Sequence, residues 1–200
     1  MRLMMIAVLL LGWSGAVQAQ VTSPANVLTS AVTDVIRPNM LRLDASARGL
    51  ESAMVALCAV PSADALAIAG QQFGKVVAAY GRIAFVRIGP MMEDNRADRL
   101  LFWPDRRGIG LKQVQAILAE EDPTVTTLAA LQSKSVAVQG LGALEFVLFG
   151  TGAEGLSSDG GAFRCAYGQA IAGNIAAIAK DMVTAWYLPG GIADHLQAPD

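Results

Sequence analysis

The segment Val136–Gly150 constrains this chain most, because its fifteen residues carry a single charge, that of Glu145. Placed on a helix at about 100° per residue, four apolar side chains share one face with this carboxylate. These four are Val138, Leu141, Leu144 and Leu148. An ionised carboxylate in an apolar core needs a cation, a metal or hydrogen-bond donors, or else it takes up a proton. We therefore predict a buried Glu145 that either centres a functional site or only fixes helix register.

Arg87 is the predicted partner of this acid. Ser62 is a suitable N-cap for a helix whose apolar stripe runs from Phe73 to Met91, and Arg87 falls inside that stripe. These positions predict an Arg87–Glu145 ion pair. The alternative is an arginine at the edge of the stripe, with its guanidinium in water.

The first residues, Met1–Ala19, have the features of a cleavable export signal. Arg2 is followed by the short apolar run Leu3–Leu11, and small residues precede Gln20. We predict cleavage before Gln20, the alternative being a retained anchor. Loss of Arg2 would make the chain one unit more negative than the −2 of the full sequence. That charge argues against nucleic acid as a partner, and no later stretch is apolar for long enough to span a membrane.

The remaining residues, 20–200, predict one all-α domain, a helical bundle of about four to five helices. They are rich in Ala, Leu, Val and Ile, with few Gly/Pro clusters between long periodic segments. Pro38 should kink or interrupt the first helix, and Thr127 should cap one long helix that holds Glu145. The last helix begins near Ala162, with Asn174 at its edge, and the tail after Ile192 looks frayed.

Cys58 and Cys165 are the two cysteines of the chain. In an exported protein an even number suggests a disulfide, which here would join the end of the first helix to the start of the last. The alternative is a pair of buried free thiols. His195 is the single histidine and lies in the tail, so a Ser/His/Asp triad or a histidine-rich zinc site has no obvious source.

A polar segment between residues 92 and 110 contains Trp103, Asp105 and several arginines. A loop of this composition either lines a site or connects two helices, with Trp103 as an anchor in the core. The sequence leaves both alternatives open.

The run Gly140–Gly150 resembles the signature helix of the imelysin-like (M75 peptidase-type) family, in which Gly-x-His-x-x-Glu precedes an apolar run. Further short matches follow the family's order. They are Arg87–Pro90, Asn95–Arg96, Phe102–Asp105, Arg164–Ala172, and the position of Cys58. The resemblance extends over most of Gln20 to Trp186, so the chain resembles the first half of the longer family members.

The resemblance implies a helical, exported, cell-envelope family tied to iron uptake, with some members described as metallopeptidases. Gly142 stands where the family has its histidine, so Glu145 alone of the metal pair is retained. We therefore expect a periplasmic binding or accessory protein, linked to iron or another divalent metal and without peptidase activity. The alternatives are an M75-type metallopeptidase that uses Glu145, and a purely structural interaction domain.

Six residues are the expected lining of a polar pocket, with Glu145 also the expected metal ligand. They are Arg87, Asn95, Arg96, Trp103, Asp105 and Glu145. The expected partner is a small ligand or another envelope protein. A missing second half would leave an apolar face exposed, which would favour a homodimer.

Overall fold

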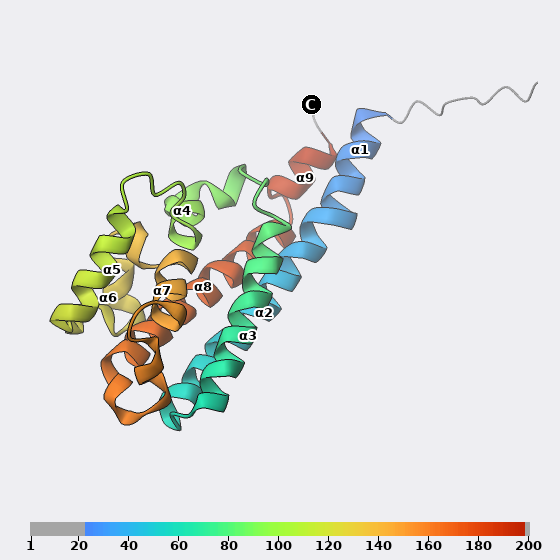
Figure 1. The fold of residues 1–200 in the computed structure, drawn as a ribbon. Helices are drawn as coiled ribbons and strands as arrows, with labels where there is room; N and C mark the ends of the chain where they lie inside the picture. Colours follow the sequence, from blue (N-terminus) through green and yellow to red (C-terminus); the bar gives the residue numbers. More distant parts are fainter. Residues whose placement is uncertain (1–22, 199–200) are drawn as a thin grey trace, which may run out of the picture.

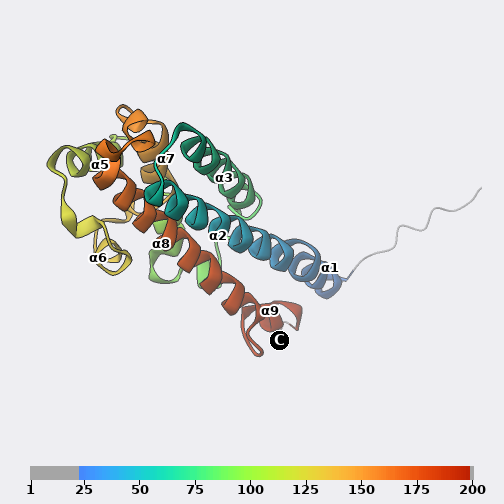
Figure 2. The ribbon, with the colours of Figure 1, turned by 90° about the horizontal axis from the view of Figure 1, so that it is seen from below.

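Three long helices lie side by side in the computed structural model, which describes residues 23–198 (Figure 1, Figure 2). They are α2 (Arg37–Ala59), α3 (Ala63–Gly81) and α8 (Ala162–Tyr187), and α2 packs against both others. The described residues contain no strand, which confirms the predicted all-α class. None of the helices described is long and apolar enough to cross a membrane. The predicted export signal lies outside the described residues.

The other helices are shorter, so the described part of the chain has more helices than the four to five predicted. The α-helices are α1 (Pro24–Ser30), α4 (Arg96–Leu100), α5 (Ile109–Glu120), α6 (Leu128–Gln132), α7 (Leu141–Phe149) and α9 (Ile192–Gln197). A π-helix, η1, spans Ala31–Ile36. Short 3₁₀ segments are η2 (Gly89–Met91), η3 (Glu93–Asn95), η4 (Pro123–Val125), η5 (Val136–Val138), η6 (Ala153–Ser157) and η7 (Asp159–Gly161). Helices α4 to α7 gather on one side of the three long helices (Figure 1).

The first rod of the fold runs without a break from α1 through η1 into α2 (Figure 1). Pro38 does interrupt the regular α pattern, as predicted, but it does not end the rod. The wide π turn comes just before it, where the N–H of Arg37 donates to the carbonyl of Val32, five residues back. Proline has no N–H and its ring crowds the preceding turn, and a wider turn relieves that crowding.

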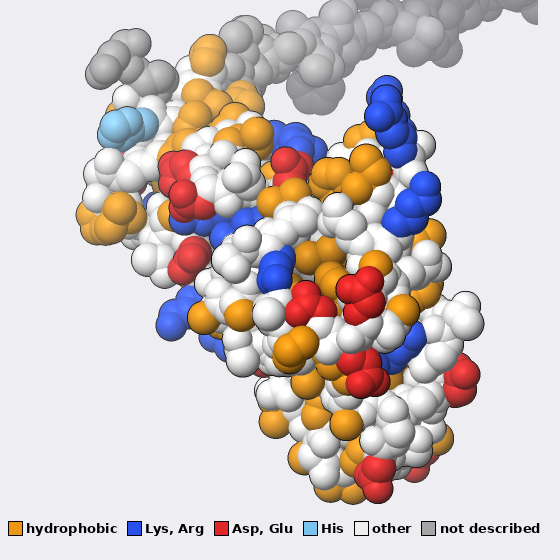
Figure 3. All heavy atoms as spheres, turned by 90° about the vertical axis from the view of Figure 1, so that its left-hand side faces the viewer, with side chains coloured by type: hydrophobic (Ala, Val, Ile, Leu, Met, Phe, Trp, Pro, Cys, Tyr) orange, Lys and Arg blue, Asp and Glu red, His pale blue; other side chains and the backbone are white. Residues whose placement is uncertain are grey.

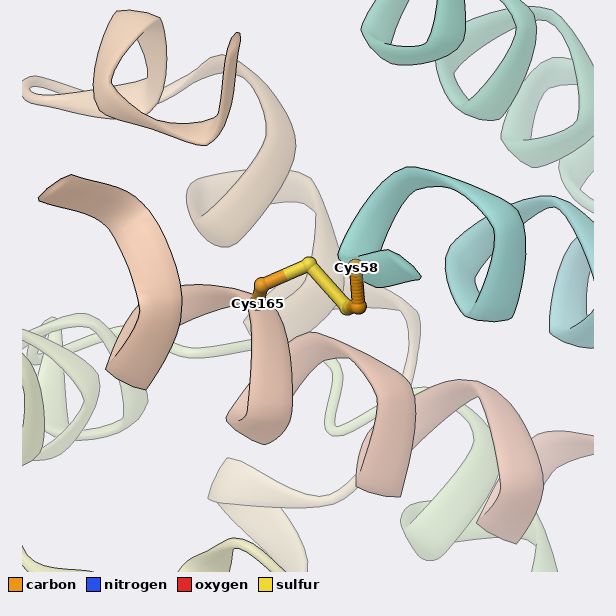
Figure 4. The surroundings of a disulfide bond; sticks show 2 residues. All are labelled: Cys58 and Cys165. Carbon is orange, nitrogen blue, oxygen red and sulfur yellow. A yellow bond between two sulfur atoms is a disulfide. The ribbon is translucent and has the colours of Figure 1, made fainter. Parts of the chain in front are cut away.

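A disulfide joins Cys58 at the end of α2 to Cys165 in the first turns of α8 (Figure 4). The prediction of a disulfide is therefore confirmed. At the other end of the same two helices, Nε of Arg37 donates to the carbonyl oxygen of Trp186 at 2.8 Å. These two contacts show that α2 and α8 run antiparallel along their whole shared length.

The predicted long helix after Thr127 is wrong, because α6, η5 and α7 divide it into three pieces. Gly140 has an extended backbone immediately before α7. A Cβ at Gly140 would overlap the carbonyl oxygens of Arg99 and Leu100. A side chain at residue 140 would force the two backbone segments apart, so glycine permits the close approach that immediately precedes α7. The predicted helix from Ser62 to Met91 is also shorter than expected, since α3 ends at Gly81.

The tail beyond Ile192 is not frayed, as the sequence suggested, but forms α9 against α8 and α1. Gly190 turns the chain back with a positive φ of 69°. The carboxylate of Asp194 accepts a hydrogen bond from the Gly190 N–H at 2.7 Å. Ala193 is fully buried, so apolar contact holds this short helix in place.

The disulfide closes a loop with a sequence separation of 107 residues. Replacing both cysteines in Cys58→Ala/Cys165→Ala should lower the free energy of unfolding by about 4–5 kcal/mol, because the unfolded chain regains loop entropy. Urea unfolding with and without dithiothreitol measures this. Reductant should destabilise the wild type and leave the double variant unchanged. Equal stability of the oxidised wild type and the double variant would contradict the expectation.

Candidate functional site

Helix α7 has two different faces. One face is buried in the core and consists of Leu141, Ala143, Leu144, Val147 and Leu148. The other face carries Gly142, Glu145 and Phe149, which are exposed, and the half-buried Phe146. These four positions follow helical spacing of three, four and seven residues, so they line one stripe.

The prediction of a buried Glu145 is therefore wrong. Its side chain lies at the border of the apolar face, between the buried positions 141 and 148 and the open positions 142 and 149. The helix turns the carboxylate toward the open side, where water solvates it and no buried partner is needed. Among residues 23–198, no ion pair or side-chain hydrogen bond involves Glu145.

The open face of α7 forms one wall of a cleft of about 420 Å³. The opposite walls come from α5 and from residues 101–105. The apolar walls include Leu101, Phe102, Trp103, Val114, Phe146 and Phe149. Clefts of about this volume, mostly apolar with few polar groups, are typical small-ligand sites. Figure 3 views the molecule from the side on which α5 and α6 lie, and shows exposed hydrophobic side chains interspersed with acidic and basic ones.

Asp105 also lines the cleft, but its carboxylate is used within the fold. One oxygen accepts from the Ile109 N–H at 2.7 Å, and the other accepts from Gly110 and Leu111 at 2.9 and 3.4 Å. These N–H groups are the first of α5, which have no partners within the helix. Asp105 therefore positions the start of α5, and Glu145 is the carboxylate of the cleft that remains available to a ligand.

The structure brings Glu145, Trp103 and Asp105 together in this cleft, but places the other three predicted residues elsewhere. The predicted Arg87–Glu145 ion pair is absent from the described residues, and Arg87 is exposed beyond the end of α3. Burial raises the pKa of the nearby Tyr80 phenol, and the charge of Arg87 offsets part of that rise.

Arg96 and Asn95 belong to a local turn rather than to the cleft. The Arg96 side chain is 16% exposed and pairs with Glu93 at 3.2 Å and Asp94 at 3.0 Å. It also donates to the Pro90 carbonyl at 2.9 Å. Asn95 is exposed with a left-handed backbone (φ 54°), a conformation that Asn tolerates better than most side chains.

A largely buried polar network lies next to the cleft residues Leu101 and Gly140. Arg99 donates to the Gln139 side-chain oxygen at 3.0 Å and to Oδ1 of Asn174 at 2.7 Å. Nδ2 of Asn174 donates in turn to the Gln139 carbonyl at 3.1 Å. Asn174 is fully buried, so its predicted place at the edge of the last helix is wrong. Burial, and then the charge of Arg96, lower the pKa of Arg99.

Tyr167 and Arg164, both on α8, fix the two ends of the α7 segment. The Tyr167 hydroxyl donates to the Val138 carbonyl at 2.8 Å, and burial raises the pKa of Tyr167. The Arg164 guanidinium donates to the carbonyls of Val147 at 3.2 Å and Thr151 at 2.6 Å. Carbonyls at a helix C-terminus lack partners within the helix, and a cation is favoured there.

The residues at the cleft do not fit a metal site of the Gly-x-His-x-x-Glu type. Gly142 offers no donor, the Asp105 oxygens are occupied by backbone N–H groups, and Glu145 alone remains. Over the whole described range, no group of three or more His, Cys, Asp or Glu side chains is placed to hold a metal ion. A Cβ at Gly142 would meet nothing within 4 Å, so the missing side chain leaves open space in the cleft.

The family model for imelysin (peptidase M75) matches residues 36–200 of this sequence. The chain belongs to the imelysin family. The crystal structure of an imelysin-like protein from Psychrobacter arcticum 273-4 has a similar fold, with a TM-score of 0.75 and 23% sequence identity. The match covers 88% of this chain and 55% of that one, so this chain spans about half the length of its structural relative. No curated protein matched the sequence.

In this imelysin-family chain, all three signature positions, Gly140, Gly142 and Glu145, line the same cleft. The aromatic walls at Phe146 and Phe149 were missed from the sequence. Their spacing from Gly142 and Glu145 is a helical stripe, which would have indicated them once the start of α7 was known.

Two glycines two positions apart should respond oppositely to alanine. Gly140→Ala should lower the free energy of unfolding by about 1–3 kcal/mol, because its methyl group overlaps the backbone of residues 99–100. Gly142→Ala should be neutral or stabilising by up to about 1 kcal/mol, since it removes a helical glycine in open space. Thermal unfolding of the two variants measures the difference. Equal effects would show that the close approach at Gly140 is not as described.

Tyr167→Phe should cost about 1–3 kcal/mol at neutral pH, because it leaves the buried Val138 carbonyl without a donor. The folded pKa of Tyr167 lies above its unfolded value of about 10, so the wild type keeps this advantage below that pH and loses it as the pH rises further. Urea unfolding of both proteins between pH 7 and 11 tests this. A difference that grows above pH 10 would have the wrong sign.

Proposed function

We propose that this chain is an exported, periplasmic binding or accessory protein of the imelysin family, which takes a small ligand in the α5–α7 cleft and does not act as a peptidase. The observation that carries the proposal is the cleft itself. It joins aromatic walls to one carboxylate, Glu145, that the fold leaves available.

The donor set supports binding rather than hydrolysis. Metal-assisted hydrolysis needs a positioned metal and a general base. Gly142 supplies no imidazole, and Asp105 is held by the N–H groups of α5, so Glu145 would have to serve alone. One carboxylate is a weak site for a divalent ion, which usually takes several protein ligands.

The disulfide between Cys58 and Cys165 supports a location outside the cytoplasm, where such bonds persist. The link to iron or another divalent metal rests on the family resemblance. An accessory role in the envelope would place the ligand, a partner protein or a second copy of this chain at the exposed apolar surface around the cleft.

Filling the cleft tests the binding role. Gly142→Leu should keep the stability of the wild type, because open space surrounds its Cβ, and should weaken binding of the neutral dye Nile red at least tenfold. Gly74→Leu is the matched control, since Gly74 is also an exposed helical glycine with nothing within 4 Å of its Cβ. Dye fluorescence titration gives the affinities. Unchanged dye binding by Gly142→Leu would contradict the proposal.

An assay with unfolded peptide substrates and added Zn²⁺ or Fe²⁺ distinguishes the alternatives. We expect no metal-dependent cleavage by the wild type or by Glu145→Ala. Cleavage that requires both metal and Glu145 would instead support an M75-type metallopeptidase. A purely structural domain would bind neither dye nor metal, and Glu145→Ala would then change only its stability.

A further inference from the structure

We infer that the α5–α7 cleft selects an organic cation, meaning a protonated amine or guanidinium carried on an apolar or aromatic body. This inference rests on the proposed binding role of the cleft and names the chemical class of its ligand.

The charges around the cleft are complementary to a cation. Its lining contains the carboxylates of Glu145 and Asp105 and no Lys, Arg or His side chain. Two arginines of the surrounding structure are held by other groups. Arg99 donates to Gln139 and Asn174. Arg164 donates to carbonyls at the end of α7, and its guanidinium lies 5.9 Å from the centroid of the Phe146 ring, so the face of that ring is already paired with a cation. A ligand ammonium beside Glu145 would therefore meet an available counter-charge, with no basic side chain in the lining itself.

The aromatic walls favour the same ligand. Trp103 is 72% exposed and Phe149 is 59% exposed, and both line the cleft with the half-buried Phe102 and Phe146. The faces of aromatic rings attract cations, and tryptophan does so most strongly. An apolar ligand body would also bury ring surface that now faces water. The cleft thus offers both a counter-charge and rings to one molecule.

An inorganic cation is less suited to this lining. Divalent metals need several oxygen or nitrogen ligands in a fixed geometry, and apolar walls supply none. An organic cation needs one carboxylate and apolar contact for the rest of its surface, which is what the walls around Glu145 provide.

One feature of the cleft favours the opposite charge. No side chain caps the start of α7, and the backbone N–H groups of its first turn lie near Gly140 and Gly142 in the lining. A helix N-terminus attracts anions. Glu145 lies within the second turn of this nine-residue helix and opposes that attraction. An anionic ligand is therefore a necessary arm of the test.

Three probes of similar shape test the inference at pH 7 by ligand-observed NMR and displacement of Nile red. They are phenethylammonium (cation), 2-phenylethanol (neutral) and 3-phenylpropionate (anion). We expect the cation to bind at least tenfold more tightly than the alcohol, and the anion to bind most weakly. Glu145→Gln should lower the affinity for the cation to that for the alcohol and should leave the affinity for the alcohol unchanged. Glu120→Gln, an exposed acid of α5 outside the cleft lining, is the matched control and should change neither.

The outcomes separate this inference from the proposed function. If the dye and the alcohol bind, and Gly142→Leu blocks them, but the cation gains nothing over the alcohol, the inference is overturned and the binding role stands. Tighter binding of the anion would also overturn it, and would indicate instead that the N–H groups at the start of α7 bind the ligand. If no probe binds and Gly142→Leu leaves the affinity for the dye unchanged, the proposed binding role itself is wrong.

Discussion

The cleft depends on one close approach of two backbone segments, at Gly140 against Arg99 and Leu100. No Cβ fits between them, so α7 starts at residue 141 and the preceding residues form separate short turns. Beside this approach, the side chains of Arg99, Gln139 and Asn174 form a network in which Asn174 also donates to the Gln139 carbonyl. A buried network of this kind specifies one arrangement, because any shift would leave a donor or acceptor without its partner.

The start of α7 also decides the role of Glu145. If the helix continued back to Val138, the apolar face would be centred near Leu141 and would include Glu145. Burial of Ala143 and Val147 instead moves the centre of that face away from the acid. In the observed register it borders the core and faces a cleft with aromatic walls. The same carboxylate therefore changes from a structural ion-pair residue to a group that can meet a ligand, although the sequence around it is the same.

This imelysin-family chain differs from the family pattern at residue 142, a position that matters for metal binding. The family pattern that the sequence resembles pairs a histidine with Glu145, whereas this chain has Gly142. The glycine removes a metal donor and adds open volume beside the remaining acid. The chain also spans about half the length of its structural relative, so an activity of the longer protein cannot be assigned to this chain from the shared fold.

The sequence by itself determined the all-α class, the family and the Cys58–Cys165 bond. These follow from local periodicity, residue type and short motifs, which act over a few residues. Only the tertiary structure decided that Trp103 and Asp105 meet Glu145 while Arg87 does not, and that Asn174 is buried. Such facts depend on which segments touch across large separations in sequence. A helical wheel also misplaces the centre of the apolar face when it includes a residue outside the helix, as Val138 is outside α7.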